Sequence, residues 1–168
     1  MKEILIDEEH IKERVRELGF EISRDYDGKE VVIICVLKGA AYFAVDLTRE
    51  LSIPFILDFI SISSYGNSPS GVVRITKDLD INILERYVLL VEDIVDTGLT
   101  LSYLLRSLRA RNPEDLKVCT FLDCPSRRIV EVPIDYKGFE IPNVFVVGYG
   151  LDYRERFRSL PYVAVFER

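Results

Sequence analysis

The sequence has 168 residues, of which 48% are hydrophobic and 30% are charged, and its formal net charge is −6. This composition predicts one compact domain over residues 1–168, and the acidic balance argues against a protein that binds nucleic acid. No apolar run approaches the roughly 20 residues of a membrane span, and the charged N-terminus lacks the apolar region of a signal peptide, so we expect a cytoplasmic protein without a membrane partner.

The hydrophobic pattern predicts strands that alternate with helices. Asp7 is a suitable N-cap for the first helix, because apolar residues recur after it at helical spacing up to Ile22. The segment 31–37 is apolar at nearly every position, as in a parallel strand buried on both faces. In the first half of the chain, we predict a strand at 4–6, a helix after Asp7, a strand at 31–37, a helix at about 41–51 and a strand at 55–62. A returning strand at 72–76 and a buried strand at 87–91 come next, before a helix that follows Thr100 and ends before Pro113. The last predicted strands are at 118–122, 144–147 and 162–166, the third of them at a sheet edge.

This alternation indicates an α/β fold with a central parallel sheet flanked by helices. Ligands of such sheets bind outside the carboxyl ends of the strands. One connection stands out, because residues 63–71 are polar and rich in turn formers, which predicts a long flexible loop. Long loops in compact domains are usually functional.

The segment 92–100 (EDIVDTGLT) follows a fully apolar predicted strand and carries three carboxylates and a Thr-Gly-x-Thr turn before a helix. Backbone N–H groups, hydroxyls and a helix N-terminus together suit a phosphate, and Gly98 permits a tight turn. The acids would repel a phosphate, so they must face hydroxyls, a cation or a proton to be removed. An ordinary loop with solvated acids is the simpler alternative, but charges beside a buried strand need partners.

The run 91–100 resembles the phosphoribosyl-pyrophosphate (PRPP) signature of type I phosphoribosyltransferases, and most closely that of the hypoxanthine-guanine phosphoribosyltransferases. The resemblance covers roughly residues 30–166 and implies the type I fold, with a small hood and a flexible lid loop beside the central sheet. Further segments match that family in its order, namely Leu37-Lys38-Gly39, Ser64-Tyr65-Gly66, Asp123-x-Pro-x-Arg-Arg, and FVVGYGLDY from Phe145 with Phe157-Arg158 after it.

The resemblance assigns the PRPP and metal contacts of the signature. Glu92 and Asp93 would hold the ribose hydroxyls and, through them, Mg²⁺. Asp96 would act as general base while N9 of the purine attacks C1′ and displaces pyrophosphate. The residues that would hold the 5′-phosphate are Thr97, Gly98, Leu99 and Thr100.

The remaining segments would bind pyrophosphate and the base. Lys38, Gly39 and Arg158 would contact pyrophosphate, and Ser64 and Tyr65 would form the tip of the lid. For Lys38 the simpler alternative is a surface lysine at a strand end, and without the resemblance Asp152 and Arg158 are better explained as solvated charges in a polar loop. The residues that would contact the purine are Phe145, by stacking, Val146, through its backbone, and Asp152, near a second Mg²⁺; a Phe in a buried strand is otherwise a core residue.

Cys124 departs from the family, which has a lysine at this position that donates to the 6-oxo group of the base. A thiol is a weak donor without a positive charge, so the preferred base is open. The odd number of cysteines, with no regular spacing, predicts free thiols rather than a disulfide framework.

The alternatives concern the base and the role. A phosphoribosyltransferase for xanthine or adenine would share these motifs, and so would a non-catalytic regulator that senses PRPP or a nucleotide. The regulator would need a basic nucleic-acid-binding face, which this acidic chain lacks. A nucleotide hydrolase is disfavoured, because no G-x-x-x-x-G-K-[ST] segment is present. The resemblance also implies a homodimer or homotetramer that acts on small molecules in purine salvage.

Overall fold

The computed structural model describes residues 3–65 and 72–167, with the backbone alone for Ser64, Tyr65 and Val72. Six strands of this described part form the central sheet, in which every pairing is parallel except that of β4 with β3. In spatial order they are β4 (Val72–Lys77), β3 (Phe55–Tyr65), β2 (Val31–Leu37), β5 (Tyr87–Val95), β6 (Asp115–Asp123) and β7 (Tyr136–Glu140). The predicted parallel sheet is confirmed.

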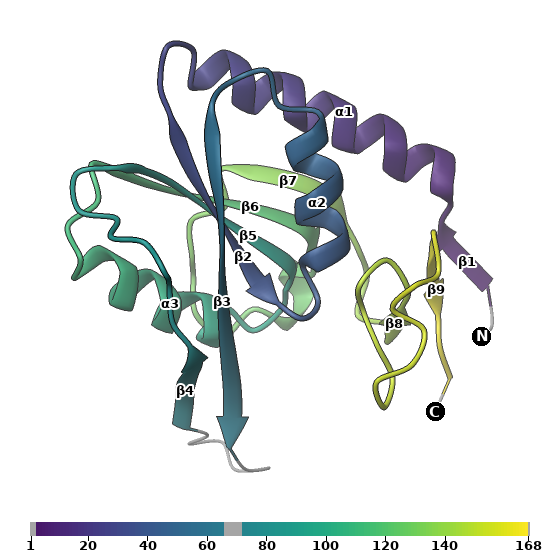
Figure 1. Cartoon of the computed structure of the whole chain (residues 1–168). Helices are drawn as coiled ribbons and strands as arrows, with labels where there is room; N and C mark the ends of the chain where they lie inside the picture. The colour runs from purple at the N-terminus through teal and green to yellow at the C-terminus, as the bar shows by residue number, and fades with distance from the viewer. Residues whose placement is uncertain (1–2, 66–71, 168) are drawn as a thin grey trace.

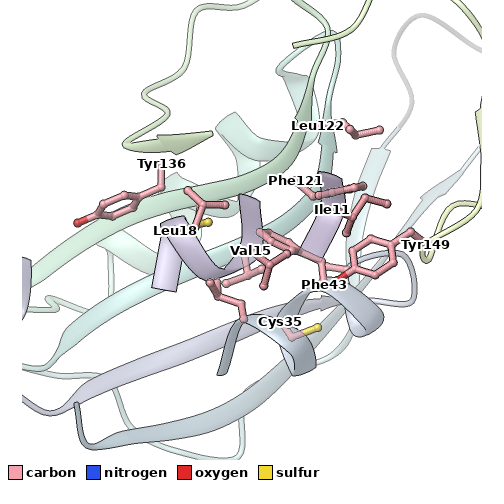
Figure 2. Packing of buried hydrophobic residues seen from close by; sticks show 14 of the residues in the cluster. Ile11, Val15, Leu18, Cys35, Phe43, Phe121, Leu122, Tyr136 and Tyr149 are labelled. Atoms are coloured by element: carbon pink, nitrogen blue, oxygen red, sulfur yellow. The ribbon is translucent and has the colours of Figure 1, made fainter. Parts of the chain in front are cut away.

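Helices cover both faces of the sheet (Figure 1). Helices α1 (Glu8–Asp25) and α2 (Ala41–Arg49) pack on one face, and α3 (Leu99–Arg109) packs on the other through its leucines. Figure 2 shows Ile11, Val15 and Leu18 of α1 in the same buried cluster as Phe121 and Phe43, with Ile11 beside Phe121. The ring centroids of Phe121 and Phe43 are 5.3 Å apart. The two-faced burial explains why the central strands are apolar throughout.

The start of α1 follows the expected capping geometry. The Oδ1 atom of Asp7 accepts a hydrogen bond from the backbone N–H of His10 at 3.0 Å, which satisfies one of the free donors of the first turn. The predicted N-cap is therefore confirmed.

A second, smaller sheet lies beside the first, where both termini are found (Figure 1). Within the described residues it has the order β1 (Glu3–Ile6), β9 (Val163–Val165), β8 (Val146–Val147), with antiparallel pairing. The prediction of an edge strand at 162–166 was wrong, because the N-terminal strand adds to its free side and makes it central. The strand at 144–147 is shorter than predicted and belongs to this hood, not to the parallel sheet.

Several element boundaries also differ from the prediction, three of them near the cavity described below. Strand β3 continues through Tyr65 and β4 begins at Val72, so pairing in an antiparallel ribbon takes up residues expected in a loop. The rest of the expected lid loop, 66–71, lies outside the described residues. Strand β5 continues through Val95, so Glu92 and Asp93 lie in a strand and not after it. Helix α3 begins at Leu99, two residues earlier than predicted.

Strand β7 was not predicted. It is short and lies at the edge of the sheet, and it contains Gly138, where a Cβ would approach the carbonyl oxygen of Phe121 to 2.3 Å. All three cysteines are free and buried, as expected. In the described part of the chain, none of the helices combines the length and the hydrophobicity that a membrane crossing requires.

Candidate active site

The carboxyl ends of β2 and β5 border a cavity of about 470 Å³. The two strands are neighbours in the sheet, so the turns that follow them meet at one edge. Of the predicted site residues, eight line this cavity: Lys38, Gly39, Glu92, Asp93, Asp96, Gly98, Thr100 and Asp152. A second hollow of about 430 Å³, between α1, α2 and the hood, is lined by none of the predicted site residues.

Glu92 and Asp93 place two carboxyl groups at the floor of the cavity. Glu92 is only 4% exposed, and burial, together with the carboxylates of Asp93 and Asp96, raises its pKa well above the ordinary range. Burial likewise raises the pKa of Asp93 to about 6, although its Oδ1 accepts a hydrogen bond from the N–H of Ile94 at 2.8 Å. Glu92 is buried and Asp93 is half-buried, so two acids that repel one another here call for hydroxyl donors or a cation from a ligand.

Gly39 lets the turn after β2 approach these acids. A Cβ at this position would lie 1.7 Å from the Oδ2 atom of Asp93, so no other residue fits without displacing that carboxylate. A Cβ on Gly150, in the hood, would in turn lie 1.9 Å from the carbonyl oxygen of Gly39. The peptide bond between Leu37 and Lys38, one residue before, is cis.

The turn before α3 has the geometry of an anion site. Gly98 is the N-cap residue in the left-handed conformation, with φ of 82°, and the first N–H of the helix, that of Leu99, donates only a long hydrogen bond of 3.4 Å to the Oγ1 atom of Thr97. The carbonyl oxygen of Thr97 accepts hydrogen bonds from the N–H groups of Ile129 and Val130 at 2.9 and 3.0 Å, which holds the turn from outside. N–H groups at the start of α3 are thus available to a phosphate.

Asp96 lies between the acidic pair and this turn, and its side chain is 38% exposed. Its Oδ1 accepts a hydrogen bond from the N–H of Thr97 at 2.7 Å, and the Nη1 atom of Arg127 lies 3.4 Å from its Oδ2. One carboxylate oxygen is therefore oriented by the backbone, while the other faces an exposed cation. The carboxylate is held in place and accessible, as a proton acceptor must be.

Cations and acids from two distant segments meet beside the cavity. The Nζ atom of Lys38 lies 2.8 Å from the Oε2 of Glu155, and the Nη2 of Arg158 lies 3.2 Å from the Oε1 of the same residue. Arg158 also pairs with Asp152, at 3.1 Å between Nη2 and Oδ1. The predicted pyrophosphate residues Lys38 and Arg158 are thus brought together by a carboxylate that sequence reasoning missed.

Phe145 and Val146 lie in the hood. The half-buried ring of Phe145 packs edge-on against Tyr153 and Phe166, with ring centroids 6.0 and 6.2 Å away. Val146 is buried in β8. Both lie in the chain segment that leads to the Gly148–Gly150 turn, so the hood positions them as a unit.

Cys124 follows β6 and is 2% exposed. Its Sγ atom lies 3.6 Å from both the carbonyl oxygen of Pro142 and the Oγ of Ser126. The neighbouring Asp123 carboxylate pairs with Arg128 and, at 2.8 Å, with the Nζ of Lys137. Arg128 is consequently engaged by Asp123 and by backbone carbonyl groups, whereas Arg127 is half-exposed beside Asp96.

Two residues at the site were not assigned a role from the sequence. Glu155 lies in a segment with charges at nearly every position, so no pattern distinguished it from a solvated acid. Arg127 was recognisable only as one of two adjacent arginines. Within residues 3–65 and 72–167, no three potential ligands from His, Cys, Asp and Glu form a ready-made metal cluster. Any divalent ion would therefore take much of its coordination from substrate and water.

The arrangement combines an anion-binding turn, buried acids suited to hydroxyl groups or a cation, an oriented carboxylate and a pair of cations. Comparison with known proteins gives a consistent result. Residues 2–154 match the phosphoribosyl transferase domain family.

Curated relatives extend the match over nearly the whole chain. The hypoxanthine-guanine phosphoribosyltransferase of Mycobacterium avium is 50% identical over 175 residues, covering 99% of this chain and 86% of its own length. That of Bacillus subtilis is 47% identical over 169 residues, covering 99% of this chain and 94% of its own. A crystal structure of a hypoxanthine-guanine phosphoribosyltransferase from Bacillus anthracis superimposes with a TM-score of 0.96 at 47% identity and covers 99% of both chains.

Proposed function

The chain belongs to the phosphoribosyltransferase family, among the hypoxanthine-guanine enzymes of purine salvage, and we propose that its 92–100 segment carries out the transfer of a 5-phosphoribosyl group from PRPP to the purine. The observation that supports this assignment is the juxtaposition of the buried Glu92, the half-buried Asp93 and the N-terminus of α3 at one cavity.

In this proposal the 5′-phosphate lies on the turn at Thr97, Gly98, Leu99 and Thr100. The N–H groups and the positive end of α3 stabilise its charge. The ribose hydroxyls donate to Glu92 and Asp93, which satisfies the buried carboxylates. Both ends of the sugar are then fixed, so the reactive C1′ is held beside Asp96.

The residues present fit a divalent cation. Glu92, which is buried, and Asp93, which is half-buried, are acids with raised pKa values, while Lys38 and Arg158 pair with other acids. We propose that Glu92 and Asp93 hold Mg²⁺ together with the ribose hydroxyls, and that Asp152 holds a second ion. When bound, Mg²⁺ offsets the charge of the departing pyrophosphate.

Asp96 is the proposed general base. N9 of the purine attacks C1′, the bond from C1′ to the pyrophosphate oxygen breaks, and its electron pair leaves with pyrophosphate. The proton of N7 passes to the exposed Oδ2 of Asp96, whose other oxygen is held by Thr97. Lys38, the backbone of Gly39 and Arg158 receive the leaving group.

The base is proposed to stack on Phe145, with its edge read by backbone groups of Val146. Cys124 is expected to contribute little to base recognition, because its buried thiol is a weak hydrogen-bond donor to a 6-oxo group. We propose that 6-oxopurines remain the preferred bases because backbone groups around Val146 in the hood recognise the edge of the purine. Ser64 and Tyr65 are proposed to form the tip of the lid over PRPP. We further propose that residues 1–168 form a single catalytic domain and that the protein assembles as a homodimer or homotetramer.

The direct test is pyrophosphate release from PRPP and Mg²⁺ with hypoxanthine, guanine, xanthine or adenine, measured separately. We expect release with hypoxanthine and guanine, and none when Mg²⁺ is removed by a chelator. A protein that binds PRPP but releases pyrophosphate with none of the four bases would contradict the proposed catalysis and favour a sensor.

A further inference from the structure

The carboxylate of Glu155 forms ion pairs with both Lys38 and Arg158, the two cations proposed to bind pyrophosphate. The two oxygens of Glu155 are divided between them, Oε2 with the Nζ of Lys38 at 2.8 Å and Oε1 with the Nη2 of Arg158 at 3.2 Å. Lys38 follows β2, whereas Glu155 and Arg158 lie in the hood segment. Lys38 and Glu155 are 117 residues apart in the sequence. Only the tertiary fold makes this three-residue bridge.

The backbone around Glu155 is held in an uncommon conformation. Arg154, Glu155 and Phe157 have φ values of 53°, 62° and 77°, in the left-handed region that residues other than glycine rarely adopt. The turn is closed by reciprocal backbone hydrogen bonds between Tyr153 and Arg156, both at 3.1 Å. Such conformations persist where the surroundings enforce them, and they concentrate at ligand-binding sites.

Glu155 is further tied to the other acid of this segment. Its backbone N–H donates to the Oδ2 of Asp152 at 2.8 Å, while the Oδ1 of Asp152 pairs with Arg158. The guanidinium of Arg158 is anchored by donation to the carbonyl oxygen of Gly150 at 2.7 Å. The Nε of Arg158 is buried and has no hydrogen-bond partner among the described residues. Arg158 therefore stays in place and retains a donor for a further acceptor.

The carboxyl group of Glu155 carries a negative charge, as a partner of two cations should. Hydrogen bonding from Lys38, followed by the charge of Arg158, lowers the pKa of its carboxyl, so it is ionised at neutral pH. The side chains of Glu155 and Lys38 are 64% and 67% exposed, so their ion pair is solvated and opens at small cost. An anion with more charge displaces such a carboxylate readily.

We infer that Glu155 is a positioning residue that substitutes for pyrophosphate in the free enzyme and is displaced by it. This inference rests on the proposed function, in which Lys38 and Arg158 bind pyrophosphate. The Glu155 carboxylate keeps the two cations together before the substrate binds and competes with the pyrophosphate group for them. Competition weakens the binding of pyrophosphate and so favours its release after transfer.

The test is calorimetric binding of inorganic pyrophosphate, with Mg²⁺, to the full chain and to Glu155→Gln. Gln keeps the shape and removes the charge, so we expect pyrophosphate to bind about three- to tenfold more tightly, because exposed ion pairs are individually weak. Purine nucleoside 5′-monophosphate, which has no pyrophosphate group, should bind with unchanged affinity. A general loss of structure would change both affinities.

Glu17→Gln is the matched control, since Glu17 is a half-exposed acid paired with Arg14 on α1 and its loss changes the net charge equally. It should leave pyrophosphate affinity unchanged. In a Lys38→Met background, the effect of Glu155→Gln should be at most half as large, because one of the two contested cations is gone.

The outcomes separate the two proposals. If Lys38→Met weakens pyrophosphate binding but Glu155→Gln does not strengthen it, the role of Glu155 is refuted and the site assignment stands. If Lys38→Met leaves pyrophosphate affinity unchanged, the assignment of this cation fails and the role of Glu155 fails with it. If Glu155→Gln and Glu17→Gln increase the affinity for pyrophosphate equally, the increase is explained by the change in net charge alone, and the proposal is refuted.

Discussion

Three acids within five residues have different surroundings, and this difference determines what each can do. Glu92 is buried at the strand end, Asp93 lies against Gly39, and Asp96 reaches the cavity rim beside Arg127. Burial raises the pKa values of the first two, so they are suited to ligands that bring hydroxyl donors or a cation. Asp96 keeps one oxygen accessible for proton transfer.

Asp96→Asn should lower kcat by about 10²-fold or more while PRPP binding stays nearly intact, because an amide accepts no proton from the base. The side chain keeps its size and one oxygen for the N–H of Thr97. Steady-state kinetics with hypoxanthine, together with PRPP affinity, checks this. Wild-type kcat across the pH range in the variant would show that another group is the base.

Cys124→Lys should raise kcat/KM for hypoxanthine by roughly ten- to a hundredfold, as for a gained charge-assisted hydrogen bond, and should lower any activity with adenine. An ammonium facing a 6-amino group leaves both donors unpaired. Cys124→Met is the control for size without charge. If the ratio of hypoxanthine to adenine activity stays the same in the lysine variant, position 124 does not face the 6-substituent.

At the scale of elements, the active site is built from the turns that follow β2 and β5 and from the hood segment, and glycines permit their close approach. Gly39 lies against Asp93, and Gly150 lies against Gly39, so the hood, the turn after β2 and the end of β5 form one contact series. Gly98 sets the direction of α3 relative to β5. A side chain at any of these positions would separate the elements that the site needs together.

Gly98→Ala should destabilise the protein by about 1–3 kcal/mol and weaken binding of ligands with a 5′-phosphate. Its φ is 82°, and the added Cβ would lie 2.3 Å from the carbonyl oxygen of Val130. Gly28→Ala is the matched control, because Gly28 has φ of 74° but nothing within 4 Å of the added Cβ. Denaturant unfolding and nucleotide binding distinguish the two. Equal ligand affinity in both variants would argue against the turn as the phosphate site.

At the scale of the whole molecule, the buried acids have a cost in stability. The pKa of Asp93 is raised in the folded state from 3.8 to about 6, so between these pH values the folded state binds more protons than the unfolded state. Unfolding free energy consequently falls as pH rises through this window. The ligand-free protein retains this cost above pH 6, and the proposed binding of a sugar and a cation would relieve it.

Asp93→Asn should therefore stabilise the ligand-free protein at pH 7–8 by up to about 3 kcal/mol, the linkage equivalent of this pKa rise. The gain should shrink as pH falls below about 6 and vanish below about 3, where the native carboxyl is protonated in both the folded and the unfolded state. Denaturant unfolding across pH measures it, with the exposed Asp27→Asn as control. PRPP affinity should fall in the same variant. A stability gain that is independent of pH would rule out this linkage.

Much of the fold was determined by local sequence. The apolar runs of β2, β5 and β6 and the helical spacing of α1 predicted a parallel sheet covered on both faces, because burial on two faces imposes a pattern that periodicity reveals. The 92–100 segment likewise predicted the candidate site, since its acids and its Thr-Gly-x-Thr turn are contiguous, and five of its predicted site residues line one cavity.

Only the tertiary structure decided the features made by distant partners. Strand β7 and the central position of β9 depend on neighbours far along the chain, and β3 is extended by pairing with β4. The bridge from Lys38 through Glu155 to Arg158, the burial of Cys124 and the contact of Gly150 with Gly39 have the same origin. Local propensity reports on a residue and its near neighbours, whereas ion pairs and close backbone contacts depend on where the fold brings distant segments together.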